Sequence, residues 1–219
     1  MNVQSFSTNA IRTLVRVPVT LAISIAALVI ATMPALAEAL QFDRAAIAAG
    51  ELWRLATCHL THWNGEHILW DLLMFAVLGA LCEWRSPARM RWCAVAGAAA
   101  VSATVIWLFP TVELYRGLSG IDTALFTLLA IALLRDARRE QNVGQMFCTG
   151  GLLIGLAAKI AYEAVGGQTI FVEQTAAGFL PLVWDHVAGA LVGAILAMCG
   201  SWQNCGRLSS QLAFPRPAA

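Results

Sequence analysis

The stretch Gly117-Leu118-Ser119-Gly120 decides the fold, because a polar loop turns there into an apolar helix. The apolar run from 121 to 134 is shorter than the about 20 residues that a membrane span usually needs. A short helix predicts that Ser119 lies below the membrane surface, at a helix N-terminus whose first N–H groups lack intrahelical partners. Such groups can face a developing negative charge, and a hydroxyl there can be a nucleophile if a base lies within reach. The alternative is that Ser119 only caps the helix, between glycines that let helices pack closely.

Composition and apolar segments indicate a protein that crosses a membrane several times. Of the 219 residues, 59% are hydrophobic and 12% are charged, and the mean hydropathy is +0.69. These values exclude an ordinary soluble domain. The formal net charge of +1, without a basic aromatic patch, gives no support to nucleic-acid binding. Six apolar segments predict an all-α bundle of six transmembrane helices: 17–37, 67–82, 92–109, 119–134, 144–165 and 180–200.

The placement of basic residues predicts the orientation of this bundle. We expect a membrane domain over 17–200, a cytoplasmic N-terminal segment at 1–16 and a cytoplasmic tail at 201–219. The basic residues that gather at one set of segment ends are Arg12, Arg16, Arg85, Arg89, Arg91, Arg135, Arg138, Arg139, Arg207 and Arg216. By the positive-inside rule both termini are cytoplasmic, and Ser119 lies near the outer face.

The first segment has an alternative interpretation as a cleavable secretory signal. Arg12 and Arg16 precede its apolar run, and residues 33–38 contain an Ala-x-Ala pattern. Cleavage would leave five spans without moving the other elements. We favour retention, because the remaining helices then pair into an even bundle.

Polar residues near the outer ends of the later segments are candidates for a site. The connection at 38–66 is too polar to span and too aromatic for a free linker, so we expect short interfacial helices there. His67 and Asp71 share one helical face by their i, i+4 spacing, either as part of a site or as a satisfied pair that only holds helices together. Lys159 and Glu163 have the same spacing, for which a mutual ion pair is the expected role.

His186 is the candidate base for Ser119. It lies a few residues inside the outer end of its segment, at the depth expected for Ser119. Gly189 and Gly193 give a G-x-x-x-G face on the His186 side, and Gly120 with the alanine four residues later gives a similar face on the Ser119 segment. Close approach of these faces would bring His186 to Ser119. Histidine would then take the serine proton and later give one to a leaving amine.

Together these motifs resemble the rhomboid family of intramembrane serine proteases, over roughly residues 48–197. The motifs that carry the resemblance are Trp53-Arg54, His67, Gly117-Leu118-Ser119-Gly120 and His186-x-x-Gly189-x-x-x-Gly193. More narrowly, the chain is similar to rhombosortases, the branch that processes proteins with C-terminal Gly-Gly sorting tails. The motifs for that branch are Glu51-x-Trp53-Arg54 with His59-x-x-His62-x-Asn64, Tyr115-x-Gly117-Leu118-Ser119-Gly120, and Lys159-x-x-Tyr162-Glu163.

The resemblance implies Ser119 as nucleophile and His186 as general base and then acid. It implies an oxyanion site made by His67 and the N–H groups at Ser119 and Gly120. The family has an asparagine where this chain has Asp71, which would repel an oxyanion when ionised, could donate a hydrogen bond when protonated, or could only orient His67. Supporting roles fall to Trp53, Arg54, Gly117, Gly189, Gly193, Lys159 and Glu163. A lid near 167–180 and a lateral gate at the fifth helix are also implied, and no cofactor or metal is.

The sequence therefore predicts an intramembrane serine endopeptidase that cleaves membrane-anchored proteins near the outer face, at C-terminal Gly-Gly sorting tails. Expected partners are substrates with a C-terminal transmembrane tail and the lipid bilayer, but not nucleic acid. The expected location is the bacterial inner membrane, with the site toward the periplasm. Other interpretations stay open: a non-catalytic protein that binds membrane helices, which Asp71 favours, a transporter, and a haem or metal protein with His59, His62, His67 and His186 as ligands.

Overall fold

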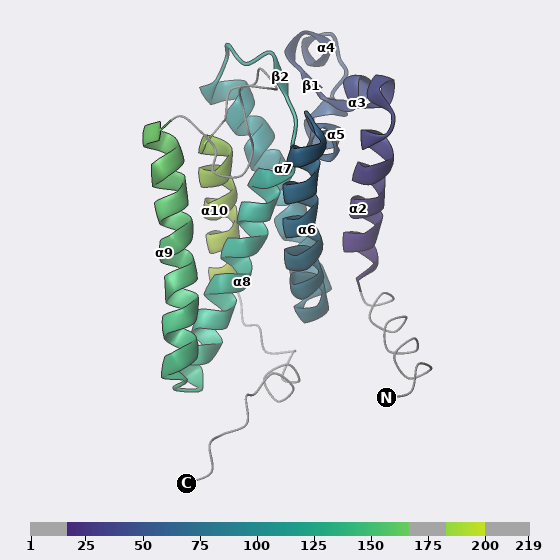
Figure 1. The fold of residues 1–219 in the computed structure, drawn as a ribbon. Coiled ribbons are helices and arrows are strands. Elements are labelled where there is room, and N and C mark those ends of the chain that lie inside the picture. The colour runs from purple at the N-terminus through teal and green to yellow at the C-terminus, as the bar shows by residue number, and fades with distance from the viewer. Residues whose placement is uncertain (1–16, 167–182, 200–219) are drawn as a thin grey trace, which may run out of the picture.

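The computed structural model describes residues 17–166 and 183–199, and most of them are helical (Figure 1). The long helices are α2 (Pro18–Ala31), α6 (Gly65–Arg85), α7 (Pro87–Leu108), α8 (Ser119–Arg139), α9 (Val143–Gly166) and α10 (Val183–Met198). The short elements are α3 (Pro34–Leu40), β1 (Phe42–Asp43), α4 (Arg44–Ala48), α5 (Arg54–Thr57), η1 (Cys58–Leu60) and β2 (Leu114–Tyr115). The expected terminal segments at 1–16 and 201–219 and the expected lid near 167–180 lie outside the described residues.

Three of the described helices are long and apolar enough to cross a membrane, namely α6, α7 and α9. The pair α2 and α3 passes the same test when taken together, and α10 is a shorter apolar helix. The described part of the chain is therefore a helical membrane protein, and the count of six spans stays a prediction.

The expectation of one continuous helix over 17–37 is wrong. Helix α2 ends at Ala31, and α3 leaves it at an angle of 118°. The break has a local cause, because the residue before a proline avoids the helical region and Met33 has φ −127° and ψ 83°. Pro34 then begins α3, where its missing N–H costs nothing.

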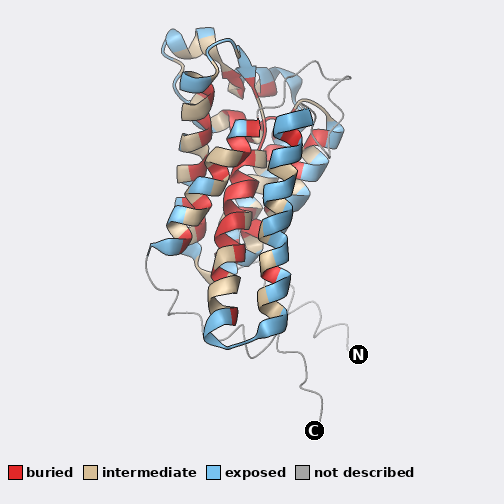
Figure 2. Ribbon diagram, turned by 90° about the vertical axis from the view of Figure 1, so that its left-hand side faces the viewer, coloured by how far each residue is buried: buried red, intermediate tan, exposed pale blue. Residues whose placement is uncertain are grey.

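Helix α8 is the centre of the bundle and is longer than predicted. Its apolar run was expected to end at 134, but the helix continues through the charged residues to Arg139 and has 21 residues. The premise of a short helix is therefore wrong, although the predicted start at Ser119 is confirmed. Figure 2 shows α8 buried along most of its length, whereas only Thr149 and Glu163 are buried within α9.

Charged side chains fasten the ends of other helices. The Glu83 carboxylate on α6 accepts hydrogen bonds from the N–H groups of Val19 and Thr20, at 3.0 and 2.8 Å, where α2 begins. Arg44 donates to the carbonyl oxygens of Val105 and Phe109 at the end of α7, each at 2.9 Å. Both contacts satisfy backbone groups that have no partner within their own helix.

The connection between α2 and α6 contains the short helices that the sequence predicts, and also a strand pairing that it does not. Strand β1 pairs antiparallel with β2, with Phe42 opposite Tyr115. Arg54 is buried and donates to the carbonyl oxygens of Glu38 and Gln41, at 2.8 and 3.0 Å. The connection is thus fixed on the loop that leads into α8.

Candidate active site at the start of helix α8

Gly117 holds the loop before α8 tightly against α6. Its φ of +133° is in the region that favours glycine, and a Cβ there would lie 2.9 Å from His67 Nε2 and 3.2 Å from Asp71 Oδ2. Its N–H donates to the Cys58 carbonyl oxygen at 3.3 Å, and its carbonyl oxygen lies 3.2 Å from His59 Nδ1. The loop is therefore fixed between η1 and α6, and Ser119 becomes the first residue of α8.

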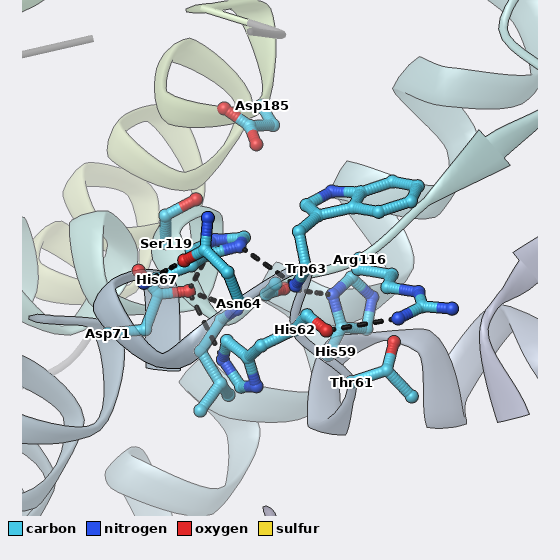
Figure 3. Close-up of polar contacts among 12 residues, drawn as sticks. His59, Thr61, His62, Trp63, Asn64, His67, Asp71, Arg116, Ser119 and Asp185 are labelled. Carbon is cyan, nitrogen blue, oxygen red and sulfur yellow. Dashed lines mark hydrogen bonds and ion pairs between the residues drawn. The ribbon is translucent and has the colours of Figure 1, made fainter. Parts of the chain in front are cut away.

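Ser119 does not cap the helix. Leu118 occupies the N-cap position, and no side chain makes a capping hydrogen bond there. The Ser119 side chain is half-buried, beside the polar groups drawn in Figure 3. The interpretation of Ser119 as a cap is therefore wrong, and its hydroxyl is not occupied in that way.

One carboxylate oxygen of Asp71 lies close to three nitrogen atoms (Figure 3). Asp71 Oδ2 accepts a hydrogen bond from the Leu118 N–H at 2.9 Å and lies 3.2 Å from His67 Nε2 and 3.4 Å from His62 Nε2. The Trp63 N–H points at His67 Nδ1 at 3.4 Å, so that nitrogen is the acceptor and Nε2 carries the proton toward Asp71. These contacts favour Asp71 as an acceptor that orients His67 and holds the loop.

His62 and Arg116 connect this cluster to the neighbouring chain segments. Burial lowers the pKa of His62, so its imidazole is neutral near pH 7. Arg116 donates to the His62 carbonyl oxygen at 3.0 Å and to Gln41 Oε1 at 2.8 Å, and its guanidinium lies 4.8 Å from the centre of the Trp63 ring. Arg116 therefore joins the first connection to the loop before α8.

The small residues of α8 and α10 meet as the sequence predicts. A Cβ at Gly189 would collide with the carbonyl oxygen of Gly120, and a Cβ at Gly193 would collide with that of Ala124. A Cβ at Gly120 would lie 3.2 Å from the carbonyl oxygen of Asp185. Backbone contact therefore brings the first turn of α8 against the first turn of α10, which carries His186.

His186 is buried between carboxylates from two helices. Its Nδ1 lies 3.0 Å from Glu163 Oε2 on α9, and its Nε2 lies 3.6 Å from Asp185 Oδ1. Burial and the nearby Asp185 raise the pKa of Tyr115, so its phenol keeps the proton that it donates to Asp185 Oδ2 at 2.9 Å. No hydrogen bond joins Ser119 and His186 among the described residues, and catalytic hydrogen bonds often tighten only when substrate is bound.

Glu163 is the site contact that the sequence did not reveal. The predicted ion pair with Lys159 is confirmed at 2.8 Å, and the same oxygen, Oε2, also faces His186. The i, i+4 spacing gave Glu163 a complete partner within its own helix. Its near-total burial beside His186 results from the packing of α9 beside α10, which the spacing along α9 does not indicate.

The remaining predicted residues have structural surroundings. Trp53 is exposed at the start of α5, and Arg54 binds backbone carbonyls. His59, a candidate ligand in the metal interpretation, has Nε2 3.1 Å from the Ala98 carbonyl oxygen and Nδ1 close to Gly117. Within residues 17–166 and 183–199, no three His, Cys, Asp or Glu side chains are arranged to hold a metal ion.

Comparison with known protein families matches residues 49–203 to the Rhomboid domain, a span that includes Ser119 and His186. The chain belongs to the rhomboid family. Its members are serine proteases that act on membrane proteins within the bilayer. Comparison with curated proteins gives no match. The family and the apolar helices identify a multi-pass membrane protein.

Proposed function

We propose that this rhomboid protein is an endopeptidase in which Ser119 is the nucleophile and His186 the general base. The observation that carries the proposal is the backbone contact of Gly189 with Gly120, because it brings the helix turns of Ser119 and His186 together. The absence of a capping bond at Ser119 supports the same role, since its hydroxyl is not used to cap the helix.

The reaction would follow the serine protease pattern. His186 Nε2 takes the proton of Ser119 Oγ as that oxygen attacks the carbonyl carbon of the scissile peptide bond. The tetrahedral intermediate collapses when His186 gives the proton to the leaving amine, which leaves an acyl group on Ser119. Water, deprotonated by His186, then releases the acyl group and restores Ser119.

The oxyanion would be stabilised by N–H groups at the start of α8. The first N–H groups of a helix lack intrahelical partners, and here they belong to Ser119 and Gly120. The Leu118 N–H is occupied by Asp71. We therefore assign Asp71 the role of orienting His67 rather than that of a donor to the oxyanion.

The substrates that fit best are membrane-anchored proteins with a C-terminal transmembrane tail, and more narrowly tails that begin with Gly-Gly. The rhombosortase motifs support this specificity, and from those motifs Lys159 pairs with Glu163 and Arg54 binds a backbone carbonyl oxygen. The asymmetry of basic residues supports cleavage on the periplasmic side of a bacterial inner membrane, with both termini cytoplasmic.

Labelling with a fluorophosphonate serine probe tests the chemistry. Detergent-solubilised wild type should be labelled, and Ser119→Ala and His186→Ala should not be. Ser24→Ala, which removes a serine from α2, is the matched control and should label like wild type. A folded wild type that does not label, or a Ser119→Ala variant that cleaves a Gly-Gly-tailed substrate normally, would refute the proposal in favour of a non-catalytic protein that binds membrane helices.

A further inference from the structure

We propose that Glu163 is a positioning residue that fixes the imidazole of His186 for catalysis. This inference rests on the proposed function, because it concerns the same reaction at Ser119. It assigns Glu163 a second role in addition to its ion pair with Lys159, and it makes the site depend on three helices: α8, α9 and α10.

The contact between Glu163 and His186 sets the tautomer of the ring. Glu163 Oε2 lies 3.0 Å from His186 Nδ1, and the side chains are 1% and 9% exposed. Lys159 Nζ is also near Nδ1, at 3.4 Å, but the Glu163 oxygen is closer at 3.0 Å. An ionised carboxylate can only accept a hydrogen bond, so we assign the proton to Nδ1. The lone pair is then on Nε2, the nitrogen that a base needs to take a proton from Ser119.

Lys159 compensates the negative charge of the buried Glu163 carboxylate. An unpaired charge in a membrane protein interior is costly, and Lys159 Nζ lies 2.8 Å from the same Glu163 oxygen. The Lys159 side chain is 25% exposed, so it is less buried than the Glu163 carboxylate that it pairs with. Glu163 is therefore a paired anion while His186 is neutral, and it faces the imidazolium that forms during each proton transfer.

The other carboxylate near His186 does not compete for this role. Asp185 Oδ1 is 3.6 Å from Nε2, which is beyond hydrogen-bond range, and Tyr115 holds its other oxygen at 2.9 Å. Asp185 is therefore on the Nε2 side, held by the loop before α8. Glu163 is on the Nδ1 side, where a carboxylate orients a catalytic histidine without blocking its base nitrogen.

The test compares two equally buried glutamates. Both Glu163 and Glu83 are 1% exposed, but Glu83 binds backbone N–H groups of α2. We expect Glu163→Leu to lower kcat for a tailed substrate by about 100-fold or more with little change in KM. Glu163→Asp should recover part of the loss. Glu83→Gln should lower the thermal unfolding temperature and leave kcat unchanged.

Nitrogen NMR of the four histidines measures the tautomer of His186, which a change in stability alone would not alter. With ¹⁵N-labelled histidine, wild type should show His186 protonated at Nδ1, and Glu163→Leu should show a mixture of tautomers. Glu163→Gln keeps the shape and an acceptor oxygen, so it should keep the tautomer while losing about tenfold in kcat with the charge. If Glu163→Leu does not fold, the kcat of Glu163→Gln tests whether Glu163 positions His186.

Two results separate this inference from the proposed function. If Ser119→Ala is inactive but Glu163→Gln and Glu163→Leu retain wild-type kcat, Glu163 is only structural and the inference fails while the function stands. If Ser119→Ala cleaves normally, the proposed function fails first. A wild-type spectrum with His186 protonated at Nε2 also overturns the inference.

Discussion

Two histidine–carboxylate pairs flank the start of α8, and they differ in how they are built. His67 and Asp71 lie one turn apart on α6, with 3.2 Å between Nε2 and Oδ2. His186 and Glu163 come from different helices, with 3.0 Å between Nδ1 and Oε2. The first pair joins a helix to a loop, because Asp71 also holds the Leu118 N–H. The second joins two helices and leaves the other nitrogen of its histidine on the side of Asp185.

The difference shows that residue types alone do not define a role. Nε2 of His67 faces Asp71 while its Nδ1 accepts from the Trp63 N–H, whereas Nδ1 of His186 faces Glu163, where we assign its proton. His67 therefore has polar partners at both ring nitrogens. The Nε2 of His186 lies 3.6 Å from Asp185, beyond hydrogen-bond range, so the lone pair of that nitrogen can act as the base assigned to catalysis.

Replacing His186 and His67 one at a time should give the largest difference in activity between the two pairs. We expect His186→Ala to lower kcat/KM by about 10⁴-fold or more, because the general base is lost. His67→Ala should cost about 10- to 100-fold, since it loosens the loop and the oxyanion site without removing the base. Cleavage rates of a tailed substrate in detergent give both values. Equal losses in the two variants would contradict separate roles.

Separating α8 from α10 should have the next largest effect. Gly189→Val places side-chain carbons where the Gly120 carbonyl oxygen lies, so the helices must move apart. We expect a loss of about 1–3 kcal/mol in stability and about 100-fold in activity, since small displacements misalign Ser119 and His186. Gly155→Val is the control, because a Cβ at Gly155 of α9 meets nothing within 4 Å. Thermal unfolding and cleavage should both separate the variants.

Much of this site could be predicted from sequence, because its main signals are local. The G-x-x-x-G face identified the α8–α10 contact, and the stretch Gly117-Leu118-Ser119-Gly120 marked the place where the loop becomes α8. The bend after Ala31 was missed although Pro34 signals it, because hydropathy averages over a break in the backbone. Apolarity also stopped the prediction of α8 at 134, whereas helical hydrogen bonding continues to Arg139.

The contacts that were missed all depend on tertiary packing. Glu163 had a full explanation in Lys159, and nothing in the spacing of α9 pointed to His186 on another helix. His62 is nine residues before Asp71, outside any helical repeat, yet both face one carboxylate oxygen. When a side chain has two partners, the spacing of residues in the sequence indicates only the partner on the same helix.

Neutralising Asp71 should have a smaller effect than these changes. Asp71→Asn keeps an oxygen for the Leu118 N–H, so we expect a folded protein whose probe labelling changes by less than about tenfold. Asp71→Leu leaves the Leu118 N–H and two imidazoles without their acceptor and should cost about 1–3 kcal/mol. Labelling of Asp71→Asn that rises well above wild type would instead mark Asp71 as an impaired oxyanion donor.

The smallest effect concerns His59, whose ring nitrogens face backbone carbonyls of Gly117 and Ala98 instead of a carboxylate. Burial lowers the pKa of His59, so below its ordinary value of about 6.5 the unfolded chain binds a proton that the folded chain does not. Its contribution to stability is therefore complete above that pH and is lost progressively as the pH falls below it. The slope it adds is at most about 1.4 kcal/mol per pH unit.

His59→Asn should be less stable at pH 7 yet lose less stability on acidification, as thermal unfolding at several pH values would measure. An unchanged slope would mean that His59 is protonated in the folded protein, with both ring nitrogens donating to the carbonyl oxygens of Gly117 and Ala98.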